Sequence, residues 1–361
     1  MFDSIIPVSY YTHVYYNFIL LVLVLGVIKL SSKPAILQGK KEYKSMVLLI
    51  IVLLYMGLRP ISGVFTDMVN YNYIFEQFAM GYEIDVNGDI LWNSFMKFCS
   101  AVMTAKMFFF ICALLYVVPL YVASKKWLGA NRYYLFLMAL ASFSFWTYGT
   151  NGIRNGVATS LFVLGLSYSN NKKLISFLIF FIALNIHQSI LIPLFAFVLT
   201  IFFKDPKKYL LGWLLAIPLS LLLGSFWETF FASLGLGGDR VRYLTGGNIN
   251  NDSFAYTGFR WDFVLYSASA IYAGYYFIVK RKFKDIVYIQ LFNVYVTANA
   301  FWILVIRANF SNRFAYLSWF LMAFIIFYPF LKWNFIKNQQ RVLAYCMIAY
   351  FGFTYLMFLI K

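Results

Sequence analysis

Residues 151–191 carry ionisable groups at spacings that could bring them to opposite faces of a membrane. A turn that contains Lys172 and Lys173 joins two apolar segments, whose far ends carry Arg154 and His187. At about 1.5 Å per residue, Arg154 lies roughly 27 Å and His187 roughly 21 Å from this turn, against a hydrocarbon core about 30 Å thick. An ionisable group at that depth is costly and is therefore a candidate functional group. The alternative is an arginine that snorkels to the surface and a histidine hydrogen-bonded inside the protein.

Arginines form a second set of candidates, because they gather at the span ends and connections of one side of the predicted topology. A planar guanidinium grips phosphate or carboxylate in a fixed geometry, whereas lysine is a point charge. Several converging arginines could hold a pyrophosphate and stabilise the charge that develops on a leaving group. The candidates are Arg59, Arg154, Arg240, Arg242, Arg260, Arg307 and Arg313. The alternative is contact with lipid headgroups or ion pairing with acids such as Asp239, Asp252 and Asp262.

Asp67 is the carboxylate best placed for acid–base chemistry. It lies just outside the second apolar segment, where it could act as a general base on a hydroxyl group. The alternative role is an N-cap for a helix that starts near Val69. His187 could orient a phosphate or serve as the base instead. The chain has two histidines and three cysteines without metal-ligand spacing, so we expect neither a metal site nor a cofactor.

The elements that must position these residues are membrane helices. The chain has 361 residues, of which 62% are apolar and 12% charged, and its mean hydropathy is +0.74. No soluble domain hides that much apolar surface, so the composition predicts an all-α, multi-pass membrane protein with about twelve spans. The expected spans are residues 12–30, 44–63, 104–123, 132–149, 152–168, 172–186, 188–203, 207–224, 261–280, 285–305, 313–331 and 341–360.

The basic residues of the connections indicate the topology. Lysines dominate one alternating set of connections, residues 31–43, 124–131, 169–171, 204–206, 281–284 and 332–340. The positive-inside rule makes this set cytoplasmic and both termini extracytoplasmic. The candidate functional residues then face outward. The formal net charge of +17 follows this topology and does not indicate a nucleic-acid partner.

Two outward connections are long, and we expect a single transmembrane domain, residues 1–361, to carry both. The first connection, residues 57–106, has apolar residues at helical spacing around 71–78 and again around 91–102, which predicts helices that lie in the membrane interface. The second, residues 225–261, is rich in glycine, asparagine and aspartate. Long connections without a regular pattern are often functional.

Three short motifs resemble those of the EpsG-type branch of bacterial polysaccharide polymerases, the Wzy-like proteins. The first is the arginine, basic turn and histidine of residues 154–187. The second is a Gly-x-Arg…Asp-x-x-x-Tyr segment, matched by Gly57, Arg59, Asp67 and Tyr71. The third is an Asn-Arg-Phe-x-Tyr opening, matched by Asn312, Arg313, Phe314 and Tyr316. The resemblance spans most of the chain, although residues 59–62 lengthen the link to the aspartate beyond the family pattern.

The resemblance implies a glycosyltransferase of the bacterial inner membrane that makes O-antigen or exopolysaccharide, with its active site facing the periplasm. The growing glycan would pass from undecaprenyl pyrophosphate to the non-reducing end of the next lipid-linked repeat unit, without a metal ion. A GT-C-like membrane glycosyltransferase architecture is compatible with this function, and a chain-length regulator is an expected partner. We expect Asp67, Arg154 and His187 at the reaction centre. We expect substrate contacts from Arg59, Tyr71, Arg240, Arg242, Tyr243, Arg260, Arg307 and Arg313.

Other functions stay open at this point. An O-antigen ligase would attach finished polymer to a lipid core, and a polyprenyl-phosphate-dependent glycosyltransferase would need fewer arginines. A flippase for lipid-linked oligosaccharide would need charged groups along a cavity on both sides of the membrane midplane, whereas the predicted spans carry few charges. A structural or sensory membrane protein would leave the outward arginines unexplained.

Overall fold

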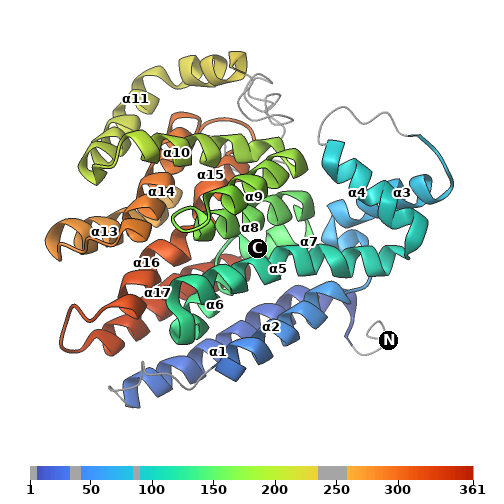
Figure 1. Cartoon of the computed structure of the whole chain (residues 1–361), viewed down its shortest axis with the longest axis horizontal. Helices are drawn as coiled ribbons and strands as arrows, with labels where there is room; N and C mark the ends of the chain where they lie inside the picture. The colour runs from blue at the N-terminus through green and yellow to red at the C-terminus, as the bar shows by residue number, and fades with distance from the viewer. Residues whose placement is uncertain (1–5, 33–41, 84–89, 235–257, 361) are drawn as a thin grey trace. The chain divides into compact units, whose positions relative to one another are not determined.

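The computed structural model describes residues 6–32, 42–83, 90–234 and 258–360, and this part of the chain is helical and contains no strand (Figure 1). The all-helical class predicted from the composition is therefore confirmed for the described residues. The predictions for Arg240, Arg242 and Tyr243 concern residues outside the described part of the chain.

Six described helical segments are long and apolar enough to cross a membrane. They are Val8–Ser32, Ala105–Leu140, Pro206–Ser233, Ile286–Leu304, Ser311–Lys332 and Gln339–Leu359. Shorter apolar helices cover Tyr43–Gly57, Lys173–Ile186 and Gln188–Phe202. The chain is thus a multi-pass membrane protein, while the count of twelve spans and the GT-C-like architecture stay predictions.

The chain divides into two compact units. The first unit comprises residues 1–187 and 330–361, and the second comprises residues 188–329. The first unit contains α1 (Tyr11–Ser32), α2 (Glu42–Gly57), α3 (Asp67–Ala79), α4 (Ile90–Val102), α5 (Ala105–Leu128), α6 (Arg132–Leu140), α7 (Phe145–Thr150), α8 (Ile153–Tyr168), α9 (Lys173–Ile186) and α17 (Gln339–Leu359).

Small residues let the helices of the first unit approach closely. A Cβ on Gly57 would lie 2.6 Å from the ring of Phe110, so only glycine allows this contact between α2 and α5. In the hairpin of α8 and α9, a Cβ on Gly165 would lie 2.4 Å from the ring of Phe180. The Ser176 hydroxyl also donates to the Gly165 carbonyl oxygen at 2.8 Å. The predicted hairpin around the lysine turn is therefore present.

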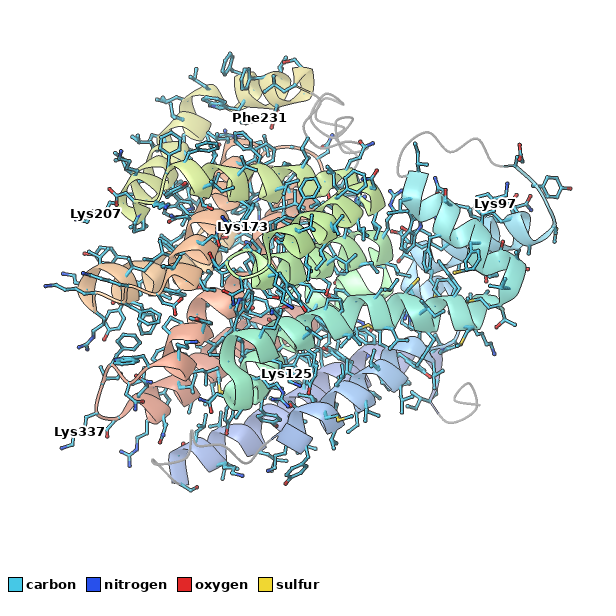
Figure 2. All side chains as sticks on the ribbon, in the orientation of Figure 1. Lys97, Lys125, Lys173, Lys207, Phe231 and Lys337 are labelled. Carbon is cyan, nitrogen blue, oxygen red and sulfur yellow. The ribbon has the colours of Figure 1, made fainter. Side chains whose placement is uncertain are left out.

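The first unit has two chemically different ends. Helices α5 and α8 run side by side in the same direction, because the Ser160 hydroxyl bonds the Tyr116 carbonyl oxygen and the Lys126 ammonium lies 3.8 Å from the Tyr168 ring centroid. We call the end with Lys126 and the turn of α8 and α9 the lysine end, and the opposite end of α8 the Arg154 end. In Figure 2, Lys97 and Lys125 lie at opposite ends of this unit.

The second unit contains α10 (Leu191–Phe202), α11 (Pro206–Ser233), α13 (Trp261–Tyr275), a π-helix (Tyr276–Lys280), α14 (Ile286–Leu304), α15 (Ser311–Trp319) and most of α16 (Met322–Lys332). Buried Asn299 links three of these helices. Its side-chain oxygen accepts from the Trp213 indole at 2.7 Å, and its amide donates to the Ser318 hydroxyl at 3.0 Å. A polar group inside an apolar bundle needs such partners, and it then fixes how the helices pack.

Several predicted boundaries differ from the structure for local reasons. Helix α2 ends at Gly57 rather than near residue 63, because Pro60 disfavours a helical conformation in the residue before it. The predicted span 132–149 is divided into α6 and α7 by the serine-containing segment 141–144. Residues 225–233, predicted as a connection, continue α11 after a kink at Leu223.

Helices α3 and α4 form where interfacial helices were predicted, and α4 carries apolar residues on both its buried and its exposed side. Trp92, Met96 and Cys99 face inward, whereas Phe98 is 65% exposed and Val102 60% exposed. An interfacial helix can have one apolar side that contacts the protein and another that contacts lipid. Apolar periodicity alone therefore does not show which of these sides packs on the protein.

Candidate functional site

The predicted site residues are divided between the two units. The first unit holds Arg59, Asp67, Tyr71, Arg154 and His187, and the second holds Arg260, Arg307 and Arg313.

Asp67 is the first residue of α3 and follows a strained backbone position. Thr66 has φ 41° and ψ −89°, a region that a β-branched residue rarely occupies. Thr66, rather than Asp67, is the N-cap residue, and its side chain makes no capping hydrogen bond. Instead, the backbone N–H of Asp67 donates to the Asn151 side-chain oxygen at 3.1 Å. The start of α3 is therefore held by a residue far away in the sequence.

Tyr71 lies one helical turn after Asp67 and shares its environment with Arg154. Burial raises the pKa of Tyr71 to about 12, the Arg154 charge lowers it, and the Asp67 charge raises it. Tyr71 therefore keeps its proton at neutral pH. Asp67, Tyr71 and Arg154 form one cluster at the Arg154 end of the first unit.

Arg154 lies in the first turn of α8, directly after the break that ends α7 at Thr150. Gly156 keeps this break tight, because a Cβ there would lie 2.5 Å from the carbonyl oxygen of Tyr148. A helix N-terminus carries partial positive charge, so together with an arginine it favours an anionic ligand.

His187 ends α9 in an extended conformation and is 5% exposed. Because α9 runs back along α8, His187 lies at the same end of the hairpin as Arg154. The sequence prediction that the hairpin brings these two ends together therefore agrees with the arrangement of the helices.

Arg59 is buried rather than open to a ligand. It is 3% exposed, and its guanidinium lies 5.5 Å and 5.9 Å from the ring centroids of Phe65 and Phe109. One guanidinium nitrogen donates to the Met56 carbonyl oxygen, and burial lowers the pKa of Arg59 to about 10. Its contacts tie the end of α2 to the segment that leads into Asp67.

In the second unit, Arg307 is held against α11. Its guanidinium donates to the Ser220 carbonyl oxygen at 2.5 Å and lies 5.5 Å from the Phe259 ring centroid. A Cβ on Gly224 would lie 2.5 Å from the same guanidinium, so glycine makes the space for it. Glu228 lies within electrostatic range of Arg307.

Arg260 and Arg313 have different surroundings. Arg260 donates two hydrogen bonds to the Asp262 carboxylate at 2.9 Å and 2.6 Å, which is the ion-pair alternative considered for the arginines. Arg313 lies 5.0 Å from the ring centroid of Phe310, a residue in the left-handed backbone region with φ 52°. Arg260 therefore already has an acidic partner.

Sequence reasoning missed Asn151 and Glu228. Asn151 lies three residues before Arg154 at the start of an apolar helix, and this position was its only signal. Glu228 is the only acidic residue in the candidate span Pro206–Ser233, which could have drawn attention to it. The described residues contain no group of three or more metal-ligating side chains.

The fold and the polar cluster define a multi-pass helical membrane protein with its ionisable candidates at helix ends. Residues 43–361 match the model of the EpsG family. The chain belongs to this family, which is a Wzy-like polysaccharide polymerase family, as the motif resemblance indicated. No significant match was found among curated proteins or among solved structures.

Proposed function

We propose that this protein is a membrane glycosyltransferase that polymerises lipid-linked repeat units. The growing glycan is transferred from undecaprenyl pyrophosphate to the non-reducing end of the next repeat unit. The observation that carries the proposal is the cluster of Asp67, Tyr71 and Arg154 in a member of the EpsG family. It combines a carboxylate, a neutral hydroxyl group and a guanidinium at the start of a helix.

In the proposed reaction, the Asp67 carboxylate accepts the proton of the acceptor hydroxyl group. The hydroxyl oxygen forms a bond to the anomeric carbon of the donor glycan, and the bond from that carbon to the pyrophosphate oxygen breaks. The electron pair of the broken bond leaves with undecaprenyl pyrophosphate. The Arg154 guanidinium and the positive end of the α8 dipole stabilise this developing negative charge.

The other candidates take supporting roles. His187 orients a phosphate or replaces Asp67 as the base. Arg307 and Arg313 contact substrate phosphates, and Arg240, Arg242 and Tyr243 contact the substrate from the second long connection. Arg260 contributes only if substrate displaces its contact with Asp262. Buried Arg59 supports the site indirectly, because its contacts hold the segment that leads into Asp67.

The proposed setting is the bacterial inner membrane, with the lysine end in the cytoplasm and the Arg154 end facing the periplasm. The distribution of lysine supports this orientation through the positive-inside rule. Both termini are then extracytoplasmic, and we propose a chain-length regulator as a partner at the outer face. The arginines supply the charge stabilisation that a metal ion gives in other transferases, so we propose a metal-independent reaction.

Two alternatives make different demands on the site. A ligase uses the same donor chemistry but a different acceptor, so the same cluster also suits it. A flippase needs charged groups along a translocation path, whereas the polar cluster of the first unit lies at one end of its helices. This location favours an enzyme.

The test uses purified protein with lipid-linked repeat units extracted from cells of the source organism that lack this chain. We expect a ladder of polymers in the presence of a chelator, and no ladder from the Arg154→Ala variant. Scrambling of the lipid between leaflets without a ladder would mean a transporter. A ladder that disappears with the chelator would contradict metal independence.

A further inference from the structure

The first turn of α3 has a capping partner that lies outside its own sequence neighbourhood. The first N–H groups of a helix lack partners within that helix, and a side chain just before the helix normally satisfies one of them. Thr66 does not provide this cap. The Asn151 oxygen provides it from 84 residues further along the chain, at 3.1 Å from the backbone nitrogen of Asp67.

The orientation of the Asn151 amide follows from this contact. A backbone N–H can only donate, so the accepting atom must be the amide oxygen rather than the nitrogen. Asn151 therefore turns its oxygen to α3, while its own backbone belongs to the break directly before Arg154. Tyr71, one turn further along α3, lies close enough to Asp67 and Arg154 to interact with both charges.

The hydrogen bond between Asp67 and Asn151 links the two candidate groups. Asn151, three residues before Arg154, holds the backbone of Asp67. The backbone of Asp67 is thus fixed by the segment that leads into Arg154. The strained Thr66 next to Asp67 shows that the surrounding contacts determine this geometry.

We propose that Asn151 is a positioning residue, which sets where the Asp67 carboxylate lies relative to Arg154. This inference rests on the proposed function, because it assigns the partner that aligns the proposed base. Displacing a reacting group by about 1 Å can cost 100-fold in rate. Asn151 thus acts on catalysis without touching the substrate. The titratable groups that interact with Tyr71 in this cluster are Asp67 on α3, Arg154 on α8 and Cys112 on α5.

The test compares Asn151→Ala, Asn151→Asp and the matched control Asn170→Asp, which makes the same chemical change at the opposite end of α8. The first measurement is backbone hydrogen exchange of the start of α3 in protein reconstituted in nanodiscs. We expect Asn151→Ala to speed exchange about fivefold, since a hydrogen bond contributes about 1 kcal/mol. Asn151→Asp keeps an acceptor oxygen and should preserve the protection.

The second measurement is the pH profile of polymer formation from lipid-linked repeat units extracted from source cells that lack this chain. We expect Asn151→Ala to lower kcat about 10-fold to 100-fold with little change in KM. Asn151→Asp should restore alignment but move the acid limb up by about one pH unit, because a second carboxylate favours the protonated form of Asp67. Asn170→Asp should change neither.

The outcomes separate the two proposals. If the wild-type protein forms a ladder and the Asn151 variants behave like it, the positioning role is wrong and the polymerase stands. The positioning role is also wrong if Asn151→Asp restores activity with an unshifted pH profile, because the residue would then be only structural. If the wild-type protein forms no ladder but Asn151→Ala speeds exchange, the contact stands and the polymerase fails.

Discussion

Arg154 combines a full positive charge with the first turn of α8, and both properties matter for its proposed role. Arg154→Lys keeps the charge but loses the planar fork that binds two phosphate oxygens at once. We expect polymer formation to fall about 100-fold in this variant, close to the loss of one preorganised donor to a developing oxyanion. The measurement is the rate of polymer formation at saturating donor. Arg341→Lys, on the exposed start of α17 at the lysine end, should match wild type. Full activity of Arg154→Lys would show that charge alone suffices there.

The Tyr71→Phe variant separates the role of the Tyr71 hydroxyl group from the role of its aromatic ring. This variant keeps a ring that could stack on a sugar but removes the neutral hydroxyl group beside Asp67 and Arg154. We expect about a 10-fold loss of activity, the order of one hydrogen bond to a group in the site. Because the pKa of Tyr71 is raised to about 12, the group is neutral below that pH, and the profile below about pH 9 should keep its shape. Full activity would mean that Tyr71 acts through its ring alone.

At the scale of elements, the α7–α8 break depends on the absence of a side chain at Gly156. A Cβ there would lie 2.5 Å from the carbonyl oxygen and 3.0 Å from the carbonyl carbon of Tyr148, and backbone atoms cannot rotate away. We therefore expect Gly156→Ala to cost about 1–3 kcal/mol of stability and to displace Arg154. The melting temperature and the polymer ladder should both fall.

The matched control is Gly352→Ala in α17, where a Cβ would meet nothing within 4 Å. Alanine in a helix interior is favoured over glycine by about 0.5–1 kcal/mol, so this variant should be slightly more stable than wild type. If the Gly156→Ala variant has the wild-type melting temperature, the close approach of Gly156 to the Tyr148 carbonyl group is contradicted.

The helices themselves were largely predictable from the sequence, because helix formation follows local periodicity and local turn residues. The hairpin of α8 and α9 follows from two apolar runs around Lys172 and Lys173, and α3 follows from the apolar spacing of residues 71–78. The inward face of α4 was not predictable, since both of its sides are apolar. The burial of Arg59 was also hidden, because it depends on Phe65 and Phe109, which come from different elements.

Contacts that join distant elements were the part of the candidate site that sequence alone could not supply. Asp67 and Arg154 were recognised by type and by their positions at span ends, but the bond between Asp67 and Asn151 connects residues 84 positions apart. No periodicity encodes such a pair. A polar residue that opens an apolar helix is a weak signal, and Asn151 shares it with many residues that only cap their own helix.

At the scale of the whole molecule, lysines gather at one end of each unit. They need no catalytic role to explain their position there. In the first unit, the Lys332 ammonium donates to the Trp127 carbonyl oxygen at 3.1 Å, and Lys126 lies over Tyr168. Helix α8 has 16 residues, so about 24 Å separates this end from Arg154, close to the thickness of a hydrocarbon core. The lysines therefore suit a role in topology, and the opposite end is left for the reaction.

This orientation predicts which positions a membrane-impermeant maleimide reaches in intact cells. In a chain whose native Cys99, Cys112 and Cys346 are replaced by serine, single cysteines are introduced at exposed lysines. Lys97→Cys, on α4, should react in intact cells, because the Arg154 end of the first unit faces the periplasm. Lys125→Cys should react only after the membrane is permeabilised, because positive charge retains its end in the cytoplasm.

The second unit provides an independent check of the same rule. Lys207→Cys lies at the start of α11 and should behave like Lys125→Cys. Labelling of Lys125→Cys in intact cells, with protection of Lys97→Cys, would show that the first unit has the opposite orientation in the membrane. An inverted first unit would expose Asp67 and Arg154 to the cytoplasm, where a reaction on the outer leaflet could not use them. The proposed polymerase therefore depends on this labelling pattern as strongly as on any single residue of its site.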